Sequence, residues 1–340
     1  MSAEKWIVRA LLAAPTVVQK MVLGEPPLQI EGRIMDLQMQ LLSKLARTKP
    51  SLDKLSVEHA RAAVRTGIAM LASKPDSTVA SHDISIEGPE SALTVRVYQP
   101  QQLDTDAPAI LYFHMGGFVV GDLDTNHDFC VTLAKTCGAK VYSVLYRKAP
   151  EHPFPAPIDD AFAAHQWLMR NATQQQVDPN RIAIAGDSAG GALTAILCQR
   201  LQAESLPQPK VQLMVYPGTS STEVGSSFEA CGNCYPLTMA EMAWFQQHFY
   251  ASPDDLNHPY SAPMNSQNLQ QLAPAIMVTA GFDPLRDQGI AYGNKLSNAG
   301  VAVTQIEISG LAHGFTSMAG GINEAKKANL LIAEQLKSLL

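Results

Sequence analysis

The chain has no stripe of basic residues, no long uncharged hydrophobic run and no internal repeat. A formal net charge of −6 at pH 7 without a basic stripe argues against nucleic-acid binding as the main task. No run of eighteen or more uncharged apolar residues occurs, so we expect no membrane-spanning helix. Length and composition favour one compact domain with an appendage. A chain of 340 residues exceeds the usual single core but fits an α/β sheet with insertions.

Cysteine is also scarce, with five in the chain, and only Cys231 and Cys234 lie close together. Zinc needs about four ligands, and no second cluster of cysteines or histidines stands at the usual spacing. We therefore predict no metal site. We expect free thiols at Cys231 and Cys234, with a disulfide between them as the alternative, and small core hydrophobes at the other three positions.

The segment from Trp6 to Leu23 is apolar enough to suggest a signal peptide. However, Arg9, Pro15 and Lys20 interrupt it, and no clear small-residue cleavage site follows. We therefore expect an amphipathic helix in this segment and a cytoplasmic protein.

From about Ser81 onward, short apolar runs alternate with helical segments, which is typical of an α/β protein. The part before Ser81 is predicted to be helical and shows no strand signal. The eight expected strands cover 84–87, 93–98, 109–113, 140–145, 181–185, 211–215, 276–280 and 301–308, and the expected helices include 128–137, 158–170, 189–203, 238–250, 285–299 and 323–340.

A serine stands at the turn between the fifth expected strand and the helix after it, in the stretch Gly-Asp-Ser-Ala-Gly-Gly at 186–191. A nucleophile at such a turn has a strained backbone, and a side chain two positions away would collide with the neighbouring elements. Gly186 and Gly190 meet that need. The context predicts that Ser188 is a nucleophile, although the same residues could simply join a strand to a helix.

A serine hydroxyl is a weak nucleophile and needs a base and an orienting acid. His313 lies in a glycine-flanked loop after the last expected strand, and Asp283 lies in a loop after the strand before it. The chain order Ser188, Asp283, His313 is the order found in α/β-hydrolases. Asp287 is close by and is the alternative partner of the histidine; otherwise it is a favourable acid in the first turn of a helix.

A second glycine-rich loop, His-Met-Gly-Gly-Phe at 114–118, follows the expected strand at 109–113. Backbone N–H groups stabilise the negative charge of a tetrahedral intermediate, and glycines let the backbone approach the substrate closely. We predict that the N–H groups of Gly116, Gly117 and Ala189 form an oxyanion hole.

Together these stretches resemble the hormone-sensitive-lipase family of α/β-hydrolase esterases, in its branch with a Gly-Asp-Ser-Ala-Gly elbow. The segment from Tyr146 to Ala156 also resembles the one that follows the fourth strand of that family, and the likeness runs from about Ser81 to the C-terminus. Met115 is a departure, because the family usually has the first glycine of a His-Gly-Gly-Gly run there. The resemblance implies an α/β-hydrolase fold with a mostly parallel eight-stranded sheet, flanking helices and a helical cap.

In the resembled family, the cap is built from the N-terminal helices and an insertion after the sixth strand. Here the alternation pauses between Tyr216 and Ala275, where a helix around Trp244 is expected. The apolar residues of both segments could equally fill an ordinary helical core. The resulting division is a cap at 1–50 and 217–255 and a hydrolase core at 51–216 and 256–340.

The prediction is a serine carboxylesterase that hydrolyses short- to medium-chain esters through an acyl-enzyme. Its ligand is a small-molecule ester, and this chemistry needs no cofactor. Two alternatives remain: a catalytically silent binding protein on the same fold, which the presence of His313 disfavours, and an amidase or peptidase with the same triad. The resemblance also implies that the last expected strand, at 301–308, is an edge strand through which such enzymes often dimerise, so we expect a homodimer.

The pair Ser51 and Lys54 matches the Ser-x-x-Lys motif of penicillin-binding-protein-like esterases. No Lys-Thr-Gly element completes such a site in this sequence. We interpret Ser51, which follows Pro50, as the N-cap of a helix.

Overall fold

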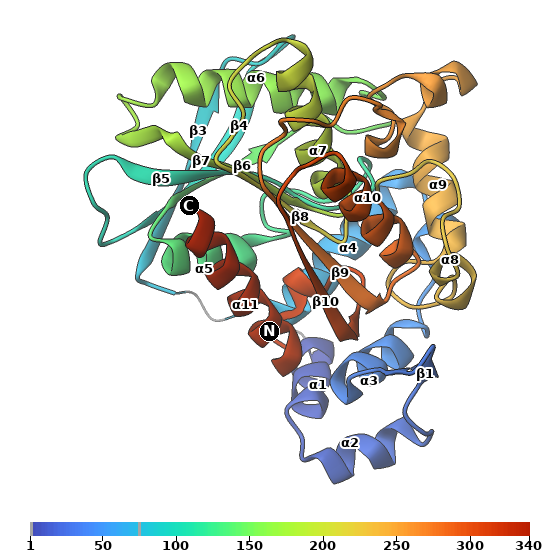
Figure 1. Ribbon diagram of the computed structural model, residues 1–340. Helices are drawn as coiled ribbons and strands as arrows, with labels where there is room; N and C mark the ends of the chain where they lie inside the picture. Colours follow the sequence, from blue (N-terminus) through green and yellow to red (C-terminus); the bar gives the residue numbers. More distant parts are fainter. Residues whose placement is uncertain (1–2, 74–75) are drawn as a thin grey trace.

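The computed structural model describes residues 3–73 and 76–340 (Figure 1). Residues 1–2 of the first expected cap segment and residues 74–75 of the expected core lie outside it. The central sheet consists of β3 (Val79–Ile86), β4 (Leu93–Pro100), β5 (Ala107–Phe113), β6 (Lys140–Leu145), β7 (Val177–Asp187), β8 (Val211–Val215), β9 (Ala275–Phe282) and β10 (Val303–Ala312).

The strand order is β10-β9-β8-β7-β5-β6-β4-β3. The pairs β3 with β4 and β4 with β6 are antiparallel, and the other five pairs are parallel. Every residue of β5, β8 and β9 is buried, as expected for central strands covered on both faces. The predicted fold class and all eight predicted strands are confirmed.

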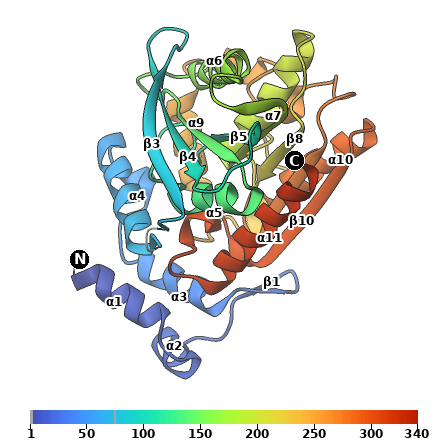
Figure 2. The same cartoon turned by 90° about the vertical axis from the view of Figure 1, so that its left-hand side faces the viewer.

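Helices cover both faces of this sheet (Figure 2). The helices α5 and α11 pack on one face, where residues such as Phe129 and Ile332 join one hydrophobic core. The helices α6, α7 and α10 pack on the other face, where Leu193 and Leu296 belong to a second core. The bounds of these helices are α5 (His127–Cys137), α6 (Ala156–Asn171), α7 (Ala189–Ala203), α10 (Arg286–Asn298) and α11 (Asn323–Leu339).

The N-terminal part corrects two expectations. The single amphipathic helix expected from Trp6 to Leu23 is two helices separated by a bend of 117°, because Pro15 has no N–H to continue a helix and its ring clashes with the preceding turn. A two-stranded hairpin also follows, where no strand was expected. The elements are α1 (Ala3–Leu12), α2 (Thr16–Leu23), β1 (Gln29–Ile30), β2 (Arg33–Ile34), α3 (Leu37–Ala46) and α4 (Val57–Leu71).

Within the described ranges, no single helix is long and apolar enough to cross a membrane. The bent pair α1 and α2 meets that test only when its two helices are taken together, by length and composition.

The insertion between β8 and β9 contains the short helices α8, α9, η2 and η3. The helix α9 begins at a capping box, in which Thr238 and Glu241 bond each other's backbone N–H groups.

Ser51 precedes a 3-10 helix, as its interpretation as an N-cap requires, but it makes no capping bond. Its hydroxyl instead donates to Asp53 at 2.5 Å. The remaining elements are η1 (Leu52–Lys54), α8 (Ser227–Ala230), α9 (Met239–Phe249), η2 (Pro253–Asn257), η3 (Pro263–Asn265) and η4 (Phe315–Met318).

Candidate active site

Ser188 occupies the single residue between β7 and α7, with φ 54° and ψ −117°. This conformation is strained for a residue with a side chain and persists only where the surroundings fix it. A Cβ at Gly186 would lie 2.2 Å from the carbonyl oxygen of Gly190, and a Cβ at Gly190 would lie 1.9 Å from that of Phe113. The predicted need for glycine on both sides of the serine is therefore confirmed.

Three of the predicted site residues meet in one hydrogen-bonded row. The Nε2 atom of His313 lies 2.8 Å from Ser188 Oγ, and its Nδ1 atom lies 2.7 Å from Asp283 Oδ2. All three side chains are buried, and Asp283 is fully enclosed. A histidine held between a hydroxyl and a carboxylate is the arrangement that can activate a nucleophile.

Asp287, the alternative acid, is engaged elsewhere. Its carboxylate pairs with the guanidinium of Arg286 at 2.9 Å and accepts the N–H of Ser227 at 3.0 Å. It lies in the first turn of α10. Burial alone would raise the pKa of Asp287, but the hydrogen bond from the Ser227 N–H and the ion pair with Arg286 together hold it below its usual value.

The glycine-rich loop after β5 is held in place through its histidine. His114 Nδ1 lies 2.7 Å from the carbonyl oxygen of Met115, and its ring stacks on Tyr146 with centroids 4.3 Å apart. Burial lowers the pKa of His114 to about 3, so the ring is neutral and donates from Nδ1. Because C=O and N–H of a trans peptide point in opposite directions, this bond turns the N–H of Gly116 away from His114.

The N–H groups of Gly116, Gly117 and Ala189 donate to no protein acceptor among residues 3–73 and 76–340. Gly117 has φ 57°, and a Cβ there would lie 2.3 Å from the ring of Phe245 in α9. Ala189 begins α7, where backbone donors have no partner within the helix. All three predicted donors thus stand beside the same cavity as Ser188.

Sequence reasoning missed a buried polar cluster directly behind the serine. The Asp187 carboxylate accepts hydrogen bonds from Tyr112 at 2.7 Å, Tyr216 at 2.9 Å, and both Asn126 and Thr316 at 3.0 Å. Burial raises the pKa of Asp187, and these four donors oppose that shift. The cluster joins the ends of β5, β7 and β8 to the segment after His313. The only signal of this cluster in the sequence was Asp187 itself, a charged residue between a buried strand and the predicted nucleophile.

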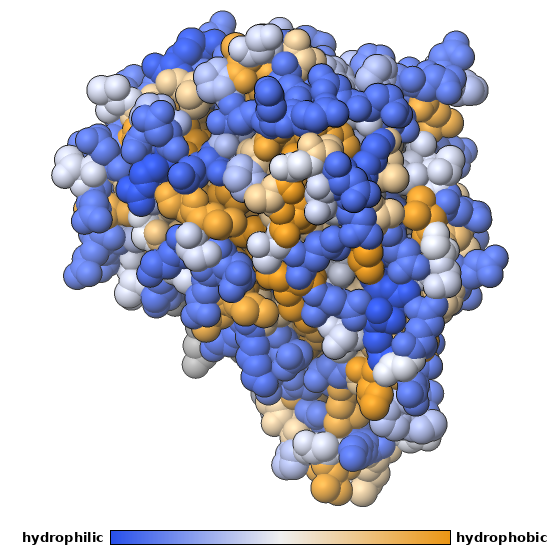
Figure 3. Space-filling model, in the orientation of Figure 1, coloured by the Kyte–Doolittle hydropathy of each residue, from blue (hydrophilic) through white to orange (hydrophobic). Residues whose placement is uncertain are grey.

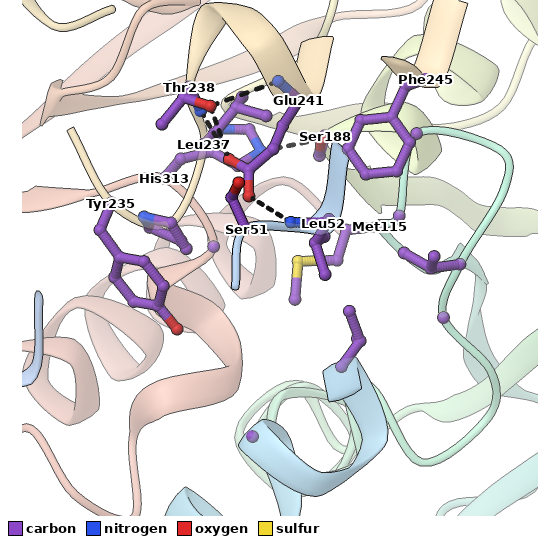
Figure 4. Close-up of a pocket in the computed structure, with 18 of the residues that line it drawn as sticks. Ser51, Leu52, Met115, Ser188, Tyr235, Leu237, Thr238, Glu241, Phe245 and His313 are labelled. Atoms are coloured by element: carbon purple, nitrogen blue, oxygen red, sulfur yellow. Dashed lines mark hydrogen bonds between the residues drawn. The ribbon is translucent and has the colours of Figure 1, made fainter. Parts of the chain in front are cut away.

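A cavity of about 1000 Å³ opens above Ser188 and His313. Its lining is mostly apolar and comes from the core loops, from α1, α3 and α4, and from α9. Figure 4 shows Met115 and Phe245 beside this space, with Leu52 and Tyr235 at other points of its wall.

Glu241 links the two segments that enclose the cavity. Its carboxylate accepts the N–H of Leu52 in η1 at 3.3 Å and both the N–H and the hydroxyl of Thr238 at 2.9 Å (Figure 4). Burial raises the pKa of Glu241, although these bonds oppose the shift. η1, which directly follows the N-terminal cap segment, and α9 are therefore joined through one buried carboxyl group.

All five cysteines are free and buried, including Cys231 and Cys234. The expectation of free thiols is confirmed. In the part of the chain that the structure describes, no group of three or more His, Cys, Asp or Glu side chains is placed to hold a metal ion.

Known proteins resemble this chain over most of its length. The family model for the alpha/beta hydrolase fold matches residues 110–317. An ethyl acetate hydrolase from Pseudomonas putida is 37% identical, over 84% of this chain and 91% of its own length. The esterase LipI from Mycobacterium tuberculosis is 38% identical, over 85% of this chain and 96% of its own length. The chain belongs to the hormone-sensitive-lipase-like family of α/β-hydrolases.

Solved structures of esterases agree with this family assignment. A thermostable esterase from Pseudomonas putida ECU1011 superposes with a TM-score of 0.84 at 29% identity, covering 89% of this chain and 96% of its own. A hyperthermophilic esterase from Pyrobaculum calidifontis gives a TM-score of 0.81 at 33% identity, covering 88% and 97%. The predicted family is confirmed, and this member is a carboxylic ester hydrolase.

Proposed function

We propose that Ser188, His313 and Asp283 hydrolyse carboxylic esters by acyl transfer to water. The observation that carries the proposal is the continuous row of hydrogen bonds, 2.8 Å from Ser188 Oγ to His313 Nε2 and 2.7 Å from His313 Nδ1 to Asp283. Asp283 keeps the proton of the neutral histidine on Nδ1, so Nε2 is free to accept the proton of the serine.

In the first step Ser188 Oγ attacks the ester carbonyl, and His313 takes its proton and then delivers it to the leaving alcohol. Water attacks the acyl-enzyme in the second step, with His313 again as the base. The oxyanion is held by the N–H groups of Gly116, Gly117 and Ala189. Each such donor contributes about 3 kcal/mol to transition-state stabilisation.

The division of the chain follows from the same proposal. Residues 1–50 and 217–255 form a cap over the site, and residues 51–216 and 256–340 form the hydrolase core. The lining of the cavity by α1 and α3 on one side and α9 on the other supports a cap made of both segments. The bond of Glu241 to Leu52 ties the second cap segment to the start of the core.

The substrate is a small-molecule ester with a short to medium acyl chain. Phe245 lies against Gly117 and Met115 lies beside Gly314, so bulky side chains narrow the cavity next to the reacting atoms. Each methylene that fits adds about 0.8 kcal/mol of binding until the chain meets these side chains. We expect kcat/KM for p-nitrophenyl esters to peak between about four and eight carbons.

The substitution Ser188→Ala tests the proposal, because it removes the nucleophile and leaves the fold intact. We expect nearly all hydrolysis of p-nitrophenyl acetate to disappear from a protein that unfolds at the same urea concentration. Comparison with a p-nitroanilide tests the alternative of an amidase. Hydrolysis of the anilide at a rate comparable with the ester would favour that alternative, and a folded unaltered protein with no hydrolysis of either would favour a silent binding protein.

A further inference from the structure

The helices α1 and α2 are attached to the rest of the molecule through one side only. On α1, Lys5 and Arg9 donate hydrogen bonds to carbonyl groups at the C-terminal end of α4. On α2, Gln19 and Leu23 are buried, four residues apart on one side of the helix. Together with α3 and the hairpin of β1 and β2, the two helices form a lobe that projects from the body of the molecule (Figure 1).

The opposite side of both helices carries large apolar side chains in contact with solvent. Val17 and Met21 are 71% and 77% exposed, and Trp6 is 65% exposed. Hydrophobic side chains gather at the tip of the projection in Figure 3. We call this surface the α1–α2 apolar face; it consists of Trp6, Ile7, Val17, Val18, Met21 and Val22.

The apolar face is continuous with the active-site cavity. Ile7 belongs to the exposed face and also lines the cavity, and Val8, the next residue, lines it as well. Behind them the cavity wall continues with apolar side chains of α3 and α4, among them Leu45 and Ile68. Ile7 therefore joins the exposed face to the cavity wall, which at this end also includes Glu4 and Lys49.

We propose that the α1–α2 apolar face docks on the surface of a zwitterionic phospholipid bilayer. The charges of α1 are engaged with the rest of the protein, since Glu4 pairs with Lys49 and Arg9 bonds carbonyl groups at the end of α4. Lys20 is exposed between the apolar residues of α2, where its long stem can follow them and keep its charge in water. Amphipathic helices of this composition lie in the plane of a lipid interface.

A second copy of the chain fits this face less well. A stable dimer interface uses about 20 to 30 residues from each partner, whereas α1 and α2 have only 10 and 8 residues, some of which face the body of the molecule. A fluid lipid surface adapts to a convex shape. Most cations beside the face are already engaged, since Lys5 and Arg9 bond carbonyl groups at the end of α4 and Lys44 bonds that of Leu23. Few cations are therefore left for anionic headgroups, which favours zwitterionic ones.

Flotation with phosphatidylcholine vesicles tests the docking, with the fluorescence of Trp6 as a second signal. We expect the protein to float with the vesicles and its emission to shift to shorter wavelength, a shift that Trp6→Phe removes. The double substitution Val17→Ser with Met21→Ser should lower the partition coefficient at least about tenfold, because two exposed side chains lose their burial in lipid. The matched control is Leu330→Ser with Leu331→Ser, at exposed positions of α11, which should bind like the unaltered protein.

The docking does not depend on the proposed function, so it is measured also on the Ser188→Ala protein. Equal flotation of the Val17/Met21 variant and the unaltered protein would overturn the proposal, as would binding only to anionic vesicles at low salt. A doubled mass in light scattering that the Val17/Met21 substitutions abolish would assign the face to a second copy. Hydrolysis of a water-soluble ester should be unchanged in the Val17/Met21 variant, which separates failure of docking from failure of the catalytic proposal.

Discussion

The ring of Phe245 lies against Gly117, so close that a Cβ on the glycine would stand 2.3 Å from the ring. A helix of the proposed cap thereby touches the loop that we assign to the oxyanion hole. The loop has φ 57° at this glycine, a conformation that residues with side chains rarely adopt. Contact and conformation both restrict this position to glycine.

We expect Gly117→Ala to lower kcat by about 10²-fold or more, since it displaces one oxyanion donor. Adding Phe245→Ala should restore part of the loss, because it removes the collision and leaves only the backbone strain. Steady-state kinetics of both single variants and the double variant measure this coupling. Strictly additive effects would show that the ring and the loop act independently.

The two neighbouring acids should differ sharply in their effect on activity. Asp283→Asn is expected to lower kcat about 10⁴-fold, since an amide favours the wrong tautomer of His313. Asp287→Asn should cost less than about tenfold, because Asp287 bonds Arg286 and Ser227 rather than the histidine. The kcat of the two folded variants on one ester decides the matter, and the reverse ranking would assign the orienting acid to Asp287.

Met115 should limit the length of the acyl chain. Its sulfur lies 3.6 Å from the position that a Cβ of Gly314 would take, next to His313, and its side chain lines the cavity. We expect Met115→Gly to raise kcat/KM for decanoate relative to butyrate several-fold, whereas Met115→Leu, with similar volume, should keep the original profile. A lower activity on all chain lengths alike would instead mean that the loop had lost its conformation.

Glu241 makes stability depend on pH. Its pKa is raised by burial, so the folded protein binds this proton more tightly than the unfolded chain does, and stability is lost as pH rises through the folded pKa. Glu241→Gln cannot ionise. The stability of this variant relative to the unaltered protein should therefore improve as pH rises from about 4 to 8, as urea unfolding at several pH values would measure. If the free energy of unfolding of the two proteins differed by the same amount at every pH, the pKa of Glu241 would be the same in the folded and unfolded states.

The proposed homodimer uses the edge strand β10. The hairpin of β1 and β2 already covers one end of this strand, because the N–H of Asp36 bonds the carbonyl of Gly310 at 2.8 Å and Arg33 pairs with Glu307 at 2.7 Å. The other end, near Val303, is left for pairing with a second copy. We expect light scattering to give twice the mass of the chain, and a monomer at working concentration would exclude the dimer.

Much of the fold and the site follows from sequence, because its signals are local. Short apolar runs bounded by turn residues predicted eight strands from Ser81 onward, and all eight became strands of the sheet. The turn at Ser188 needs glycines at 186 and 190 for steric reasons that two residues of context reveal. Sequence reasoning noticed Pro15 as an interruption of the apolar run but still expected a single helix, so the 117° bend was not predicted.

Other features exist only through contacts between distant segments. Asp187 is stabilised by Tyr112 and Thr316, which lie 75 and 129 residues away, and no local pattern reports such partners. The choice of Asp283 over Asp287 as neighbour of His313 depends on where the loop after β9 turns. Local sterics and periodicity in the sequence determine which segments become strands and helices. The packing of those segments decides which polar side chains meet. The physical reason is that a buried polar group has lost water and needs a protein partner, which distant segments supply.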